Sequence, residues 1–120
     1  LVSSTPILSP AYAVDQDFIM VDWGLAHALE LQRAFPDMPE PHTRLASARL
    51  ALEYLRTLGG SAYLPVGMVS SLIRRRRLFV VPGAPRFERA AFAIHAVRSD
   101  RKESIEQVLA MFAPAAARAS

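Results

Sequence analysis

The sequence contains no cysteine, a single lysine (Lys102) and a single tryptophan (Trp23) among its 120 residues. Without cysteine it can form no disulfide framework, no thiolate zinc site and no cysteine nucleophile. The lack of cysteine also fits a reducing compartment, so we expect a cytoplasmic protein. No apolar run approaches the ~18 residues that a membrane-spanning helix needs, and we therefore expect no membrane partner.

The positive charge of the sequence is concentrated in one short run. The chain has 14 basic and 11 acidic residues, which gives a formal net charge of +3. Four of the basic residues are Arg74–Arg77, and without them the balance is 10 against 11. A surface that tracks nucleic-acid phosphates would carry basic residues over an extended face. We expect Arg74–Arg77 to be a solvated helix end, and direct nucleic-acid binding through this run is the alternative.

Candidate strands alternate with candidate helices along most of the chain. Strands are expected at residues 17–24, 43–46, 61–64, 78–81 and 90–97, and helices at 25–35, 48–58, 66–77 and 99–113. This alternation predicts an α/β fold with a mostly parallel sheet and helices on both faces. Within the helix at 25–35, the apolar stripe comprises Leu25, Ala28, Leu29 and Phe35, and Leu31 lies outside it.

The two ends of the chain are expected to lie outside this pattern. Pro6 and Pro10 argue against a regular helix in residues 1–14, which we interpret as a linker or the start of a hinge. Pro114 should end the last helix and leave residues 114–120 as a frayed tail. We expect the sequence to begin inside a longer protein, because its first residue is Leu and no signal peptide is recognisable.

Few residue patterns point to catalysis or metal binding. His27, His42 and His95 have neither HExxH spacing nor a carboxylate placed to complete a ligand set, so we expect no metal and no cofactor. Gly59-Gly60 stands where a helix should end, which favours a C-cap and turn over a phosphate cradle. Asp22 is a candidate catalytic carboxylate without a partner base, so a turn-capping role is favoured. We expect no enzyme, and a small α/β enzyme is a less favoured alternative.

One geometric rule indicates where a ligand would bind. In open α/β sheets, ligands bind beyond the carboxyl ends of the parallel strands. Those ends are predicted at residues 22–24, 46–47 and 64–65. The helix that follows Ser47 would also offer backbone N–H groups there, which suit an anion. The rule holds for any such fold, so it indicates a place and not a particular ligand.

The order of several motifs resembles that of the LysR-type transcription regulators. The motifs are VDWG, a helix ending in FP, a helix followed by GGSAYLP, and then LFVV and APRF. The clearest is LALEYLRTLGGSAYLP at residues 50–65, which is similar to the family's helix and AGxGxxxLP signature. Leu-Gly-Gly stands there in place of Gly-x-Gly. The resemblance covers about residues 17–113 and is to the C-terminal part of the effector-binding domain.

The resemblance implies a sensing module of a bacterial transcription regulator and not an enzyme. Residues 15–84 would form lobe II of a two-lobed domain like that of type II periplasmic binding proteins, and residues 85–113 would return to lobe I. A small-molecule effector, often an organic anion, would control DNA binding by a helix-turn-helix domain that these residues do not contain. The implied effector contacts are Trp23, Leu45, Ala46, Ser47, Leu64 and Pro65.

The same resemblance implies that residues 90–113 would lack their lobe I partners. An unpaired strand exposes backbone N–H and C=O groups along its edge. Apolar side chains such as Phe92 and Ile94 would lie in water, which costs roughly 1.5–3 kcal/mol for each large side chain left unburied. We therefore expect a homo-oligomer formed through the strand or the helix of this segment, rather than a segment folded back onto lobe II.

Overall fold

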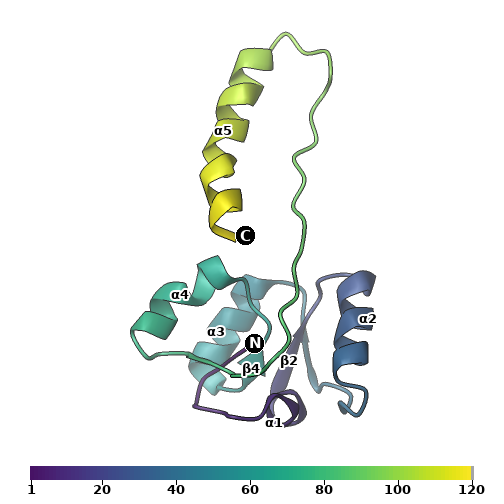
Figure 1. The fold of residues 1–120 in the computed structure, drawn as a ribbon, viewed down its shortest axis with the longest axis vertical. Helices are drawn as coiled ribbons and strands as arrows, with labels where there is room; N and C mark the ends of the chain where they lie inside the picture. Colours follow the sequence, from purple (N-terminus) through teal and green to yellow (C-terminus); the bar gives the residue numbers. More distant parts are fainter. Residues whose placement is uncertain (120) are drawn as a thin grey trace. The chain divides into compact units, whose positions relative to one another are not determined.

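The computed structural model describes residues 1–119, which contain five strands and five helices in an α/β arrangement (Figure 1). In chain order these are β1 (Val2–Ser3), α1 (Pro10–Asp15), β2 (Phe18–Val21), α2 (Leu25–Ala34), β3 (Thr43–Leu45), α3 (Ala48–Leu58), β4 (Ser61–Ala62), α4 (Val66–Arg74), β5 (Phe79–Val80) and α5 (Lys102–Ala119). The chain divides into two compact units, residues 1–87 and the residues from Glu88 onward.

All five strands belong to one open sheet in the first unit, in the order β3-β2-β4-β1-β5. Strand β2 pairs in parallel with β3 and with β4, whereas β1 pairs antiparallel with β4 and with β5. Because β1 is antiparallel to both of its neighbours, β4 and β5 run in the same direction. The α/β class predicted from the alternation is confirmed, but the sheet is mixed, and the sequence pattern did not reveal the antiparallel strand.

The segment that we expected to be a linker begins with a strand of this sheet. Val2 is buried, and β1 lies between β4 and β5. Just beyond β1, the backbone N–H of Ser4 donates to the carbonyl oxygen of Gly60 at 3.0 Å. The Ser4 hydroxyl oxygen in turn accepts from the Gly60 N–H at 3.0 Å. The linker prediction was wrong because strands of two residues are too short to show an alternating pattern.

The same segment continues into the short helix α1. The Ser9 side chain accepts from the Tyr12 N–H at 3.4 Å, and Pro10 occupies the first helical position. Proline is favoured there because the first N–H groups of a helix have no partner within the helix. Ala13 and Val14 are buried. Pro10 therefore begins a helix at the site where we expected it to prevent one.

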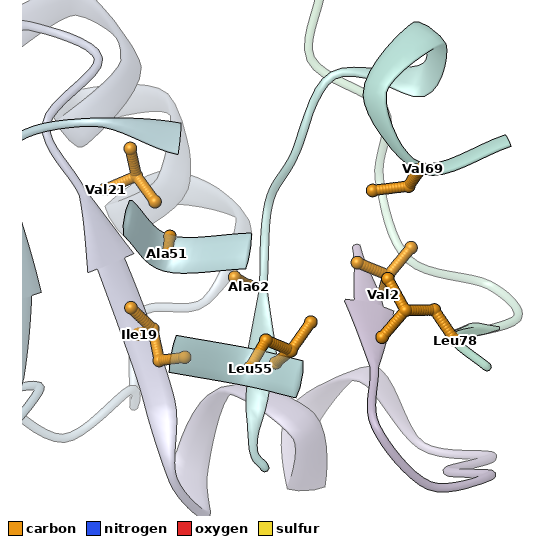
Figure 2. Close-up of a cluster of buried hydrophobic side chains, with 8 residues drawn as sticks. All are labelled: Val2, Ile19, Val21, Ala51, Leu55, Ala62, Val69 and Leu78. Carbon is orange, nitrogen blue, oxygen red and sulfur yellow. The ribbon is translucent and has the colours of Figure 1, made fainter. Parts of the chain in front are cut away.

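Two hydrophobic clusters, one on each face of the sheet, hold the first unit together. Figure 2 shows the first cluster, in which side chains of α3 and α4 meet those of the sheet. Its buried members are Val2, Ile19, Val21, Ala51, Leu55, Ala62, Val69 and Leu78. The second cluster joins α1 and α2 to the opposite face, and its buried members are Val14, Phe18, Leu31 and Tyr63. Strand β2 contributes to both clusters because successive side chains of a strand point to opposite faces.

Helix α2 buries a different face from the one that its apolar stripe predicts. His27 and Leu31 are buried, whereas Leu25 and Leu29 are exposed. His27 and Leu31 are four residues apart and so lie on one face of the helix. The prediction was wrong because it treated histidine as polar. Here the imidazole packs as an aromatic ring beside Tyr63.

Helix α4 ends three residues earlier than predicted, within the arginine run. Arg76 adopts a left-handed conformation with φ 54°. The N–H of Arg77 donates to the Leu72 carbonyl oxygen at 2.8 Å, and the N–H of Arg76 donates to that of Ile73 at 3.0 Å. This is the Schellman pattern, which usually places glycine at the left-handed position. With arginine there instead, the sequence carries no recognisable stop signal.

The second unit contains an extended segment, a reversal of chain direction and then α5 (Figure 1). Residues 90–97 do not form the expected strand, since none of residues 1–119 pairs with them in the sheet. Helix α5 continues past Pro114 to Ala119, so the expectation that Pro114 ends it was also wrong. Alanine, which has the highest helix propensity, flanks Pro114 on both sides. Ser120, the end of the expected tail, lies outside the described residues.

Candidate functional site

A pocket opens at the carboxyl ends of β2 and β3, because the chain leaves these neighbouring strands toward opposite faces of the sheet. The loop after β2 leads to α2 on one face, and the loop after β3 leads to α3 on the other. Such a divergence creates a crevice in open α/β sheets. The pocket has a volume of about 430 Å³, within the range of ~300–1,000 Å³ typical of small-molecule sites. Its lining residues are Met20, Val21, Asp22, Trp23, Gly24, His27, Ala28, Arg44, Leu45 and Ala46.

Trp23 forms a fixed apolar wall of this pocket. Its indole ring is half-buried and packs against the cluster under α3 and α4. The indole Nε1–H donates to the carbonyl oxygen of Tyr63 at 3.3 Å, which ties the loop after β2 to the residue after β4. An aromatic side chain held at both its apolar and its polar end presents a preorganised surface to a ligand.

Asp22 stabilises the turn that leads from β2 into α2. Its Oδ1 atom accepts from the backbone N–H of Gly24 at 2.9 Å. The backbone N–H of Asp22 donates to the Leu45 carbonyl oxygen at 3.0 Å, which extends the pairing of β2 with β3. Gly24 has a φ of 88°, a conformation that favours glycine. These contacts are those of the turn-capping role favoured for Asp22 on sequence grounds.

His27 contributes an aromatic ring to the same pocket. The ring lies edge-on to Phe87, with centroids 5.0 Å apart at 89°, and edge-on to Tyr63 at 6.1 Å and 75°. Tyr63 and Phe87 are themselves in contact at 4.9 Å. The Tyr63 hydroxyl donates to the Pro85 carbonyl oxygen at 3.1 Å, and burial raises the pKa of Tyr63 to about 12. A cluster of aromatic rings therefore adjoins the pocket.

Arg44 supplies the positive charge of the pocket. It lies in β3, and its guanidinium forms an ion pair with Glu40 at 3.3 Å. The side chains of Arg44 and Glu40 are 58% and 87% exposed, so water and salt weaken their attraction. Sequence reasoning missed both Arg44 and His27. Because successive side chains of a strand point to opposite faces of the sheet, the position of Arg44 next to Leu45 near the end of β3 could have indicated it.

The structure brings together half of the residues implied as effector contacts. Trp23, Leu45 and Ala46 line the pocket. Ser47 instead caps α3, because its hydroxyl oxygen accepts from the Leu50 N–H at 3.2 Å.

The other two implied contacts lie beyond the end of β4. Leu64 packs against the cluster under α3 and α4, and Pro65 is exposed at the start of α4. Neither Leu64 nor Pro65 belongs to the lining of this pocket.

A smaller pocket of about 150 Å³ lies at the other end of the same strands, where β2 and β3 begin. Asp15, Asp17, Glu40 and His42 are among its lining residues. No group of three or more histidine or carboxylate side chains within the described residues is arranged to hold a metal ion. His95 is exposed and belongs to the second unit, whereas His27 and His42 belong to the first.

The arginine run occupies the C-terminal end of α4. Arg74–Arg77 are all exposed, and within residues 1–119 none of them forms an ion pair. Cations at this end of a helix interact favourably with its dipole and with the last carbonyl groups. This environment is the solvated helix end that the sequence predicted.

Comparisons with known protein families, with curated proteins and with solved structures find no match to this chain. Within residues 1–119, no helix has both the length and the apolar character that a membrane crossing requires. The resemblance to LysR-type regulators thus stays a prediction drawn from the motifs.

Proposed function

We propose that the pocket at the carboxyl ends of β2 and β3 binds a small organic anion. The observation that carries this proposal is the convergence of Trp23 and Arg44 on one pocket of about 430 Å³. Trp23 offers a fixed apolar surface, and Arg44 offers a fork of N–H donors that matches a carboxylate. A ligand with a planar apolar part and one negative charge would satisfy both.

Of the two charged side chains that line the pocket, Asp22 is engaged within its own turn, so Arg44 is the group available to a ligand. The carboxylate of Asp22 already accepts a hydrogen bond from Gly24 within its own turn. The guanidinium of Arg44, in contrast, is held by the exposed carboxylate of Glu40. An exposed ion pair contributes only ~0–1 kcal/mol, so a ligand carboxylate can replace Glu40 at little cost.

We further propose that this binding serves effector sensing in a LysR-type transcription regulator. In this proposal residues 15–84 correspond to lobe II of a periplasmic-binding-protein-like domain. A helix-turn-helix outside the 120 residues would bind DNA. The order of the motifs supports this role, as does the presence of Trp23, Leu45 and Ala46 among the pocket residues.

The emission of Trp23 provides a direct test of anion binding, because no other tryptophan is present. We expect benzoate to change this emission in a saturable way. Benzamide, which has the same shape without the charge, should bind more weakly. Phosphate should produce no change, because it has a charge but no apolar part. A chain whose Trp23 emission responds equally to benzoate and benzamide would contradict the proposal.

Arg44→Gln should weaken benzoate binding and leave benzamide binding unchanged. A hydrogen bond to a charged group is worth ~1.5–3 kcal/mol, which corresponds to a loss of roughly 10- to 100-fold in affinity. Arg49→Gln is the matched control, since Arg49 is exposed on α3 and does not line the pocket. Equal losses of benzoate affinity in Arg44→Gln and Arg49→Gln would show that net charge, and not a contact with Arg44, governs binding.

The regulatory role has a separate test in the reading frame upstream of Leu1. We expect it to encode a helix-turn-helix domain followed by a linker helix. A different domain at that place would overturn the regulatory role and would leave the anion site as a separate question.

A further inference from the structure

The segment that opens the second unit exposes apolar side chains and an unpaired backbone. Phe92 is 83% exposed, and Ile94 and Val97 are each 96% exposed. Residues 88–96 form an extended segment (Figure 1) without a pairing strand among the described residues, and the chain bends at Val97 and Arg98. An extended apolar segment of this kind is a template for pairing with another strand.

The apolar surface of this unit has the size of one side of a dimer interface. Besides Phe92, Ile94 and Val97, the large exposed side chains of α5 include Val108, Met111 and Phe112. Val97 is at an odd position and faces away from Phe92 and Ile94, and burial of the other five side chains would remove roughly 500–700 Å² of apolar surface from water per chain. A specific dimer typically buries ~800 Å² per partner.

We propose that residues 88–98 pair antiparallel with the same residues of a second copy of this chain, centred on Ala93. In this register Phe92 lies opposite Ile94 of the second copy, and Glu88 lies opposite Arg98, at the bend that ends the extended segment. These residues are at even positions and therefore share one face of the two-stranded ribbon. The twofold symmetry gives each contact twice, as is usual for a symmetric dimer.

The charges of the segment select this register over those shifted toward the C-terminus. A shift of the centre to between Ala93 and Ile94 would place Arg89 opposite Arg98. A further shift, to a centre on Ile94, would place Glu88 opposite Asp100. Like charges directly opposite each other destabilise a strand pair, whereas opposite charges and aromatic–aliphatic pairs stabilise it.

The balance of charge in residues 88–112 also permits self-association. Residues 88–112 contain four basic side chains (Arg89, Arg98, Arg101 and Lys102) and four acidic ones (Glu88, Asp100, Glu103 and Glu106). Two copies therefore meet without net repulsion. Because an isolated two-stranded ribbon is only marginally stable, the two α5 helices supply a second layer over its apolar face.

A cysteine at the centre of the ribbon tests the register in the full chain, which has no cysteine of its own. Ala93→Cys places two thiols opposite each other, with Cα atoms ~4.5–5.5 Å apart, a distance that a disulfide can span. Ala91→Cys is the matched control on the same face, and its two Cα atoms would be ~14 Å apart, from an offset of four residues along the strand and one strand spacing across it.

Under mild oxidation we expect Ala93→Cys to form disulfide-linked dimers at least about tenfold faster than Ala91→Cys. Equal rates for the two variants would overturn the proposal, because both residues are small, exposed members of the same segment.

A charge exchange provides the second test, with association measured by sedimentation velocity. Glu88→Arg should weaken the dimer by about 5- to 10-fold, since it turns two attractive pairs into repulsive ones. Glu88→Arg combined with Arg98→Glu should restore the association. Glu106→Arg makes the same change in charge on α5 and should have little effect. A monomeric wild-type chain, or a double variant no tighter than Glu88→Arg, would overturn the proposal. The dimer proposal and the anion-site proposal can be contradicted independently of each other, because they depend on different residues.

Discussion

Gly60 connects α3 to β4 in a conformation that a residue with a side chain adopts only with strain. Its φ is +112°, and a Cβ atom added there would overlap the backbone carbonyl oxygen of Asp17. We expect Gly60→Ala to lower the free energy of unfolding by ~2–3 kcal/mol, because strain and overlap both act on a rigid backbone. Urea unfolding followed by Trp23 emission measures this loss.

Gly67→Ala is the control for the same chemical change. Gly67 lies in α4, and an added Cβ there would meet no atom within 4 Å. Because alanine has a higher helix propensity than glycine, Gly67→Ala should stabilise the chain by ~0.5–1 kcal/mol. A Gly60→Ala variant as stable as Gly67→Ala would show that the turn between α3 and β4 is wrongly described.

The hydroxyl of Tyr63 should make stability fall at alkaline pH. Burial raises its pKa from 10.0 to about 12, so the folded chain keeps the phenolic proton that the unfolded chain loses between these values. The contribution of this group is fully present below about pH 10 and decreases as the pH rises toward about 12. Stability measured by urea unfolding should therefore fall with pH more steeply in the wild type than in Tyr63→Phe.

Tyr12→Phe serves as the control for the alkaline titration, because Tyr12 is exposed. It should follow the wild-type dependence on pH. If Tyr63→Phe lost stability with pH as steeply as Tyr12→Phe, the Tyr63 hydroxyl would be in contact with water in the folded chain.

At the scale of elements, two different faces of helix α2 can be compared: the face with Leu31, which packs against the sheet in the structure, and the face with Leu29, which belongs to the apolar stripe of the sequence. Leu31 is fully buried against the sheet, whereas Leu29 is 44% exposed. We expect Leu31→Ala to destabilise the chain by ~2–5 kcal/mol and Leu29→Ala by less than about 1 kcal/mol. Thermal unfolding of the two variants decides between the faces. A larger loss of stability in Leu29→Ala than in Leu31→Ala would show that the face with the apolar stripe is the buried one.

Helix α3 was predicted correctly, from Ala48 to Leu58, because its signals are local. Ser47 accepts a hydrogen bond from the N–H of Leu50, and Gly59 ends the helix with a φ of 84°. Strand β1 was missed for the opposite reason. Its two residues are held by pairing with β4 and β5, which are distant in sequence. Contacts between distant segments leave no periodic trace in so short a stretch.

The candidate site was predictable where it depends on the ends of strands. Trp23 and Ala46 follow from the rule that ligands bind beyond these ends, and Leu45 was implied by the family resemblance. His27 and Arg44 did not follow, because their place in the pocket depends on which face of α2 is buried and on where the β3 side chains point. Both depend on tertiary packing and not on a motif.

At the scale of the whole molecule, the buried core lies in the first unit. Every buried hydrophobic side chain of the two clusters belongs to residues 1–87. We therefore expect a chain that ends at Phe87 to fold with the thermal stability of the full chain at concentrations where the full chain is monomeric. It should also remain monomeric at concentrations where the full chain associates. Circular dichroism and sedimentation velocity measure the two properties, and an unfolded 1–87 fragment would contradict the division into units.

Mapping of backbone amide chemical shifts during a benzoate titration shows whether a small organic anion binds at the carboxyl ends of β2 and β3. We expect the largest changes at residues 20–28 and 44–46, around Trp23 and Arg44. Changes that concentrate instead around Asp17 and Gly59, near the start of β2, would contradict binding at the carboxyl ends of the strands.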